Sequence, residues 1–358
     1  MPVKGNGQPS LSARKAFPLP RAGWLKALRQ WHAARMEASQ VSAWLFPAPW
    51  AWGLLAVMMA LTLLFLTFSP MRVKLGGNEM YLAIALVLLL VLAAYTAYRG
   101  VRTLALFQFA LAHAAISGVT IQLLNYLSTG WGFPYRDAEL ARLQELVGLD
   151  WKGYVFWVNE HPLVARILEL AYMSHEWLIP FTFIGLVALG MATRLREFLL
   201  LSFITALACV FISGLLPAQG AYTHYGLSPA SLRNIPDAAT IYLHDLQHVH
   251  AGTLKQFELA HAKGLATFPS FHTVMALLFA WAWRGTWLQW PVWILAALII
   301  ISTPVIGSHF FMDIVGGVAV FWLCLKLLDA VGESDPSARG GLLRLPRWPG
   351  RRVLEPAE

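Results

Sequence analysis

Two histidines and one aspartate stand out because each lies where an apolar segment begins. His272 belongs to the stretch GLATFPSFHT, residues 264–273, which leads from a long polar segment into an apolar one. His309 and Asp313 belong to STPVIGSHFFMDIVGG, residues 302–317, and lie four positions apart. On a helix, this spacing places two side chains on the same face. A carboxylate there can hold one imidazole nitrogen and leave the other free to attack an electrophile.

The residues around His272 are suited to a phosphate group. Pro269 favours the first turn of a helix, and the free N–H groups at a helix start bind anions without a metal ion. Ser270 and His272 would lie at the edge of that site. A histidine at a helix end is usually an interfacial residue, but Asp313 is costly inside a membrane unless it is paired or functional. We therefore interpret His272, His309 and Asp313 as one catalytic site.

The composition indicates that these motifs belong to a membrane protein. Of the 358 residues, 58% are hydrophobic and 13% are charged, which is too apolar for a soluble domain of this length. The apolar segments are found at about 50–68, 81–98, 103–124, 165–190, 197–216, 271–289, 291–306 and 309–330. We predict an all-α polytopic bundle with about eight transmembrane helices, within a range of about six to eight.

Basic residues predict the orientation of the bundle. The segment before the first helix is rich in Lys and Arg, with Glu37 as its one acidic residue, so the positive-inside rule places it in the cytoplasm. With an even number of spans the C-terminus is cytoplasmic too. The loops of the opposite face are then 69–80, 128–164, 217–270 and 303–308. We expect a multi-pass protein of the cell (inner) membrane with its active site on the periplasmic, extracytoplasmic face.

We expect five parts along the chain. They are a basic, amphipathic cytoplasmic segment (1–49), N-terminal transmembrane helices (50–127), outer interfacial helices (128–164), a catalytic membrane domain (165–330, with the outer loop 217–270) and a disordered cytoplasmic tail (331–358). Residues 24–35 predict an amphipathic helix on the leaflet surface. The net charge of +8 reflects this topology rather than nucleic-acid binding, because the basic residues gather at the ends and in short connections. Cys209 and Cys324 lie in apolar segments and predict neither a disulfide nor a metal site.

The two motifs resemble signatures of the type 2 phosphatidic acid phosphatase (PAP2) superfamily, which includes vanadium haloperoxidases and inositol phosphorylceramide synthases. The resemblance covers roughly residues 190–330, where PSFH is similar to the second signature and GSHFFMDIVGG to the third. It implies that His309 is the nucleophile and that Asp313 orients it. It also implies that His272 protonates the leaving oxygen and that Ser270 hydrogen-bonds the phosphate.

The sequence departs from the family pattern at two places. The third signature usually carries Ser-Arg where this chain has Ser302 and Thr303, so a phosphate-binding arginine is missing. Upstream, LPAQGAYTHYG, residues 216–226, replaces the usual Lys and Arg-Pro. Both departures resemble the inositol phosphorylceramide synthase branch, as do the stretches DWKGYVFWVNEHP and AYMSHEW. The groups of the outer loop that could compensate are Arg233, Lys255, Lys263 and several histidines.

Other polar residues have competing interpretations. His244 and His248, in HDLQHVH, have the spacing of a zinc protease motif, but no third ligand is evident, and a loop or substrate-contact role is favoured. A polar group within 165–190 either lines the active-site cavity or holds helices together. Its members are Tyr172, Ser174, His175 and Glu176. His113 is interpreted as structural.

We expect a membrane phosphatase that hydrolyses a lipid phosphoester resembling phosphatidic acid through a phosphohistidine on His309. No cofactor and no metal ion is expected, and the partners are a lipid phosphate and the membrane. Two alternatives stay open. One is a lipid phosphotransferase resembling inositol phosphorylceramide synthase, in which a lipid hydroxyl takes the phosphoryl group. The other is a non-catalytic lipid-binding or lipid-moving protein.

Overall fold

The structure is a computed structural model that describes residues 30–32, 34, 41–74 and 77–332. Within this part of the chain, nearly all regular structure is helical, and six helices are long and apolar enough to cross a membrane. These observations confirm the predicted all-α polytopic membrane bundle, with the lowest helix count of the predicted range. The predicted surface helix at 24–35 and the predicted disordered tail lie almost entirely outside the described residues.

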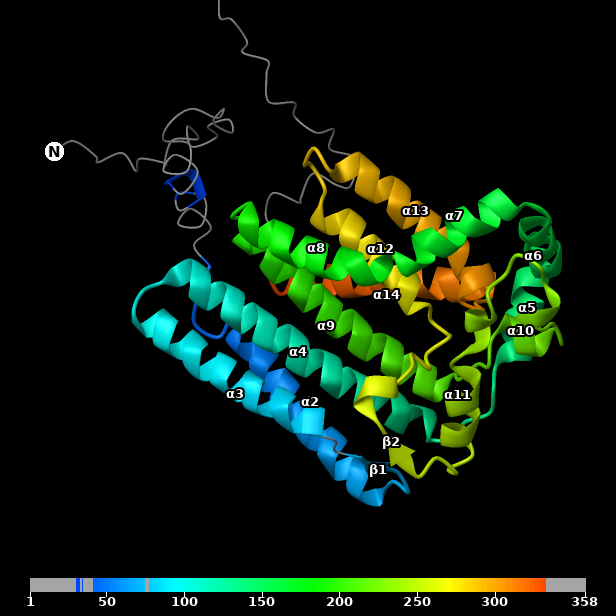
Figure 1. Ribbon diagram of the computed structural model, residues 1–358, viewed down its shortest axis with the longest axis horizontal. Coiled ribbons are helices and arrows are strands. Elements are labelled where there is room, and N and C mark those ends of the chain that lie inside the picture. The colour runs from blue at the N-terminus through cyan, green and yellow to red at the C-terminus, as the bar shows by residue number, and fades with distance from the viewer. Residues whose placement is uncertain (1–29, 33, 35–40, 75–76, 333–358) are drawn as a thin grey trace, which may run out of the picture.

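Three long helices form one side of the molecule, namely α2 (Pro49–Phe68), α3 (Gly77–Tyr98) and α4 (Arg102–Thr129) (Figure 1). Helix α4 packs against the other two and against α9 (Ala192–Leu215). In their most apolar windows, only 17% of α2 and 11% of α3 is buried inside the protein. Such apolar exposure is unfavourable in water and is typical of a lipid-facing surface.

The segment predicted as one span at 165–190 is two helices. Helix α7 (Pro162–Met173) ends and α8 (His175–Ala188) begins at Ser174, and Figure 1 shows the two meeting at an angle. Ser174 Oγ donates a hydrogen bond to the carbonyl oxygen of Ala171 at 2.6 Å, a local bond by which serine bends a helix. The single-span prediction was wrong because apolar composition continues through the break.

The PSFH motif leads into a short central helix, α12 (Phe271–Ala282), where the sequence predicted a span over 271–289. Gly285, with φ of +66°, follows its end. Nine of the twelve residues of α12 are buried, and it contacts α8, α9, α13 (Gln289–Ile306) and α14 (Phe311–Ala330). A helix enclosed by other helices need not match the bilayer thickness by itself, because protein rather than lipid surrounds it.

Short elements between the long helices gather at one end of the bundle (Figure 1). They are α5 (Asp137–Leu146), α6 (Trp151–Glu160), α10 (Ala221–His224), α11 (Leu243–His250) and the 3₁₀ turns η2 (Pro229–Ser231), η3 (Asp237–Thr240) and η4 (Leu259–His261). Helices α5 and α6 are the helices predicted within 128–164. Strand β1 (Arg72–Val73) pairs in parallel with β2 (Gln256–Phe257), so two loops predicted to share a face are hydrogen-bonded to each other.

Candidate active site

His309 and Asp313 lie side by side at the start of α14. Asp313 Oδ2 accepts hydrogen bonds from His309 Nδ1 at 3.0 Å and from the N–H of Phe310 at 2.9 Å. Helix α14 begins at Phe311, two residues later than predicted, so His309 precedes the helix and Asp313 turns back toward it. Both side chains are buried, Asp313 completely. The carboxylate therefore holds Nδ1 and leaves Nε2 of His309 unblocked.

Ser270 forms the N-cap of α12 and lies beside that free nitrogen. Its hydroxyl is 3.4 Å from His309 Nε2 and 3.4 Å from the N–H of Thr273. The N–H of Ser270 donates to the carbonyl oxygen of Asp313 at 3.0 Å, which ties the start of α12 to the first turn of α14. The sequence suggested that Pro269 lies in the first turn of the helix. It instead precedes the N-cap. The two sequence motifs thus meet at one point.

Two glycines of α14 make this close meeting possible. A Cβ atom at Gly317 would lie 2.6 Å from the carbonyl oxygen of Ser270. One at Gly316 would lie 2.8 Å from Cε2 of Phe268. Real Cβ contacts are not that short, so a side chain at Gly317 would collide with backbone, and one at Gly316 would require the Phe268 ring to shift. Glycine-mediated approach of helices is a known feature of membrane bundles.

His272, the second residue of α12, faces His309 with 6.0 Å between the ring centroids. Its other ring neighbours come from the break between α7 and α8. Tyr172 stacks on His272 at 4.4 Å between centroids, and His175 packs edge-on at 4.7 Å. Of the polar group around Ser174, these two side chains therefore line the site. Glu176 is exposed instead.

Thr303 stands where the family usually has arginine, and its main-chain carbonyl bonds to the backbone of the site. Its carbonyl oxygen accepts hydrogen bonds from the N–H groups of Gly307 at 2.9 Å and His309 at 3.3 Å. The arginine and lysine candidates to replace the family arginine are Arg233, Lys255 and Lys263. In the described part of the chain, none of the three has a hydrogen bond or ion pair with the predicted site residues, and the first two are exposed.

The loop 216–226 reaches the site from another side and is held by Asp137, a residue that the sequence did not single out. Its carboxylate accepts hydrogen bonds from the N–H of Gln219 at 3.0 Å and of Gly220 at 2.8 Å. Burial raises the pKa of Asp137, and these backbone N–H bonds oppose that shift. Gly220 has φ of +101°, and a Cβ there would lie 2.6 Å from Ser308 Oγ, next to His309. No local sequence pattern connects Asp137 with this distant loop.

The remaining histidines have other surroundings. His244 and His248 stack at 4.1 Å between ring centroids on the surface of α11. Among the described residues, no group of three or more His, Cys, Asp or Glu side chains is arranged to hold a metal ion. His113 is buried between Trp52 and Phe203, with ring centroids 5.1 and 5.3 Å away, in agreement with its structural interpretation.

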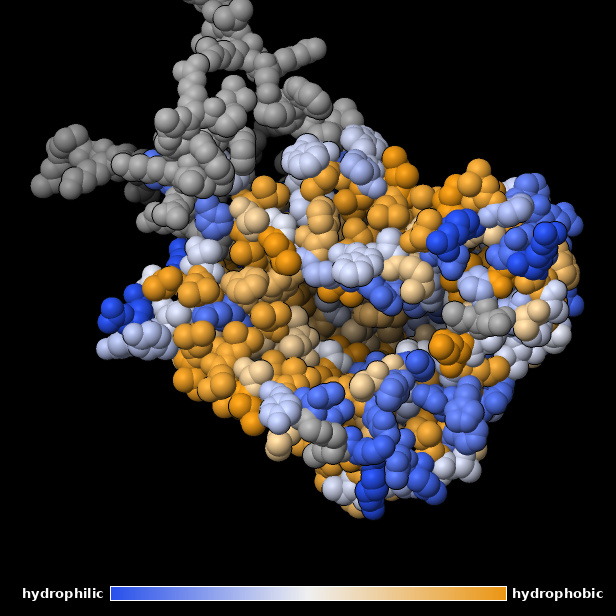
Figure 2. Space-filling model, in the orientation of Figure 1, coloured by the Kyte–Doolittle hydropathy of each residue, from blue (hydrophilic) through white to orange (hydrophobic). Residues whose placement is uncertain are grey.

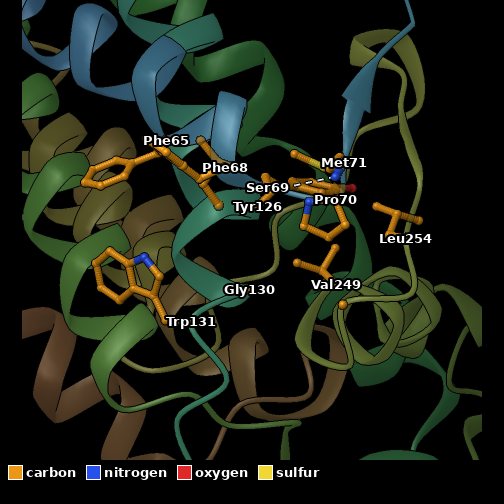
Figure 3. Close-up of a pocket in the computed structure, with 12 residues that line it drawn as sticks. Phe65, Phe68, Ser69, Pro70, Met71, Tyr126, Gly130, Trp131, Val249 and Leu254 are labelled. Atoms are coloured by element: carbon orange, nitrogen blue, oxygen red, sulfur yellow. Dashed lines mark hydrogen bonds between the residues drawn. The ribbon is translucent and has the colours of Figure 1, made fainter.

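Two hollows differ in their relation to the site. A cavity of about 240 Å³ lies beside the ends of α2 and α4 and contains none of the predicted site residues (Figure 3). Its wall includes Phe65, Phe68, Trp131, Val249 and Leu254. Figure 2 shows a separate hollow in the middle of the visible face, close to where Figure 1 places the start of α12. Apolar surface borders this second hollow on one side.

The fold and the joined motifs define an integral membrane protein with a buried histidine–aspartate site. A scan against models of protein families matches residues 138–327 to the PAP2 superfamily. Since the match covers more than half of the chain, the protein belongs to the PAP2 superfamily, a family of phosphatase and phosphotransferase type. The match begins well before residue 190, and it includes α6, α7 and α8 as well as the two motifs. Comparisons with curated proteins and with solved structures found no match.

Proposed function

We propose that this protein is a membrane phosphatase that hydrolyses a lipid phosphoester of the phosphatidic acid type through a phosphohistidine on His309. One observation carries the proposal: Asp313 occupies Nδ1 of His309, while Nε2 lies beside Ser270 at the start of α12. An imidazole held in this way is oriented for nucleophilic attack.

In the first half-reaction, His309 Nε2 attacks phosphorus, and the bond from phosphorus to the lipid oxygen breaks. His272 gives the leaving oxygen a proton. The resulting positive charge on the His309 ring is stabilised by the carboxylate of Asp313. In the second half-reaction, His272 takes a proton from water, the hydroxide attacks phosphorus, and inorganic phosphate leaves as His309 is restored.

In this proposal, neutral hydrogen-bond donors stabilise the negative charge on the phosphoryl oxygens. The hydroxyl of Ser270 already lies beside His309, at the N-terminus of α12 where the first N–H groups of the helix begin, and such fixed donors need no reorganisation during the reaction. They offset part of the charge that the family arginine would neutralise at position 303.

A lipid substrate at the outer face is supported by the position of the site in the bundle. The hollow near the start of α12 has an apolar border, as expected for a lipid chain that enters from the bilayer (Figure 2). At the other end of α12, Arg194 donates a hydrogen bond to the carbonyl oxygen of Ala282. Since arginines gather at the cytoplasmic ends of membrane helices, this contact supports an extracytoplasmic position for the site at the opposite end of α12.

A second candidate is a lipid phosphotransferase, in which a lipid hydroxyl replaces water in the second half-reaction. Thr303 favours it, because the loss of the arginine at this position resembles the inositol phosphorylceramide synthase branch. The two candidates share His309, Asp313 and His272 in the first half-reaction and differ only in the acceptor.

A panel of phospholipids tests the proposal with the purified, detergent-solubilised protein. Each lipid is supplied with and without a second lipid that bears a free hydroxyl, and with a metal chelator. We expect release of inorganic phosphate that resists the chelator and falls at least about 10³-fold in His309→Ala. The control is the double variant His244→Ala, His248→Ala, whose exposed side chains lie outside the site and whose full activity would also dismiss a zinc site.

The products separate the candidates. Transfer of phosphoryl groups between lipids without phosphate release would replace the phosphatase by the phosphotransferase. Neither product from any lipid would contradict both and favour a non-catalytic lipid-binding protein.

A further inference from the structure

The two histidines of the site have different partners at Nδ1. His309 Nδ1 lies 3.0 Å from a carboxylate oxygen of Asp313. His272 Nδ1 lies 3.3 Å from the hydroxyl of Tyr172, a neutral group. A carboxylate favours the positively charged form of an imidazole, whereas a phenol fixes the tautomer without adding a full charge. The site therefore pairs one charge-stabilised imidazole with one that is oriented by a neutral group.

Tyr172 is fixed by several contacts. Its ring stacks on His272 with 27° between the planes. Its Cε2 atom lies so close to Gly307 that a Cβ there would be 3.0 Å from it, and the same Cβ would be 2.9 Å from Cδ2 of His309. Its carbonyl oxygen is 2.7 Å from Nδ1 of His175, just past the break between α7 and α8. The tyrosine is thus held against His272, next to Gly307 and His175.

We propose that Tyr172 is a positioning residue for His272. Its phenol oxygen accepts a hydrogen bond from His272 Nδ1–H. This bond leaves Nε2 to exchange protons with the leaving oxygen and with water. This inference rests on the proposed function. In the first half-reaction, His272 starts as the imidazolium, and its Nε2–H gives a proton to the lipid oxygen as the phosphorus–oxygen bond breaks, which leaves neutral His272 protonated at Nδ1. In the second, Nε2 takes a proton from water. Nδ1–H stays bonded to the phenol oxygen in both steps.

The neighbours of His272 suit this role. The titratable groups that face it are Tyr172 from α7, His175 from α8, and His309 with its partner Asp313 from the start of α14. The partner of His272 Nδ1 is a phenol and not a carboxylate, so it adds no negative charge that would hold a proton on the ring, and the proton on Nε2 can pass to the leaving oxygen. The different partners at Nδ1 support the proposed roles of His309 as nucleophile and of His272 as proton donor.

Replacing the hydroxyl tests the proposal, since Tyr172→Phe keeps the ring that stacks on His272. The measurement is the single-turnover rate of leaving-group release from two substrates, phosphatidic acid and p-nitrophenyl phosphate. The lipid alkoxide needs a proton in order to leave, and p-nitrophenolate does not. We expect Tyr172→Phe to slow release from phosphatidic acid about 10- to 100-fold and release of p-nitrophenolate less than about threefold.

Three comparison variants define what that pattern means. His272→Gln is expected to show the same dependence on the leaving group, while His309→Ala loses both reactions. Tyr154→Phe is the matched control, because it removes a hydroxyl that donates to the carbonyl of Ile301 at 2.9 Å, outside the site. An equal loss on both substrates in Tyr172→Phe would overturn the proposal and make the tyrosine a packing residue.

A second measurement decides the hydrogen bond without any turnover. In protein labelled with ¹⁵N-histidine, the nitrogen shifts of neutral His272, assigned by their loss in His272→Gln, report which nitrogen carries the proton. We expect the Nδ1–H tautomer in the wild type and a mixture in Tyr172→Phe. An Nε2–H tautomer in the wild type would overturn the proposal. A wild type that cleaves neither substrate but shows the Nδ1–H tautomer would contradict the proposed function and support the hydrogen bond.

Discussion

One oxygen atom of Asp313, Oδ2, accepts two hydrogen bonds. It accepts from the imidazole of His309 and from the N–H of Phe310, which holds the side chain over the first turn of α14. The backbone bond fixes the position of the carboxylate, and its charge acts on the histidine. A substitution that keeps the shape and removes the charge separates these two effects.

We expect Asp313→Asn to lower kcat for phosphate release by about 10²- to 10⁴-fold with little change in KM, because the amide no longer stabilises a positive imidazole ring. The measurement is steady-state kinetics on the purified variant, with its thermal unfolding as a check on folding. Asp245→Asn is the matched control, since that carboxylate accepts from the hydroxyl of Tyr126 away from the site. A kcat within about threefold of the wild type would rule out this role for the charge.

At this scale, the sequence predicted the local pair and missed the distant partners. His309 and Asp313 are four residues apart, so their contact followed from spacing alone, even though the helix starts later than expected. The bond between Asp137 and the loop at Gln219 joins segments far apart in the chain, and no periodicity reveals it. Tyr172 was recognised only as a member of a polar group with two possible roles.

At the scale of helices, the errors arose where apolar composition does not change but the backbone does. At the break, the Ser174 hydroxyl bonds to the carbonyl of Ala171 in the preceding turn, and the end of α12 precedes a glycine with positive φ. Hydropathy is insensitive to both. These two departures matter for the site, because the first presents Tyr172 and His175 to His272 and the second leaves α12 as a short, buried helix.

Helix starts are the elements that the site depends on most. The N-cap of α12 and the first turn of α14 are joined by the bond from the N–H of Ser270 to the carbonyl of Asp313. The sequence indicated both helix starts within two residues. It could not indicate that the two starts are bonded to each other, since that contact is set by tertiary packing.

At the scale of the whole molecule, the long outer loops and the site lie at one end of the bundle, as alternation of the spans predicts (Figure 1). The orientation of this end in the membrane remains a proposal based on the basic residues. It is open to a labelling test because Cys209 and Cys324 are buried, which gives a low background.

Two introduced cysteines report the orientation. Leu146, at the end of α5, and Trp287, between α12 and α13, are each 72% exposed, so their replacement by cysteine gives thiols of matched accessibility. With a maleimide that cannot cross the membrane, we expect Leu146→Cys to be labelled in intact cells and Trp287→Cys only after permeabilisation. The reverse pattern would place the site on the cytoplasmic face.

The phosphorylated enzyme tests the account most directly. Protein mixed with ³²P-labelled phosphatidic acid is quenched in alkali within the first turnover, and the labelled residue is identified after digestion. We expect an alkali-stable, acid-labile phosphoryl group on His309 that is absent from His309→Ala and is cleared by water in the wild type. Phosphate release without a labelled histidine, or a label on any other residue, would contradict the account.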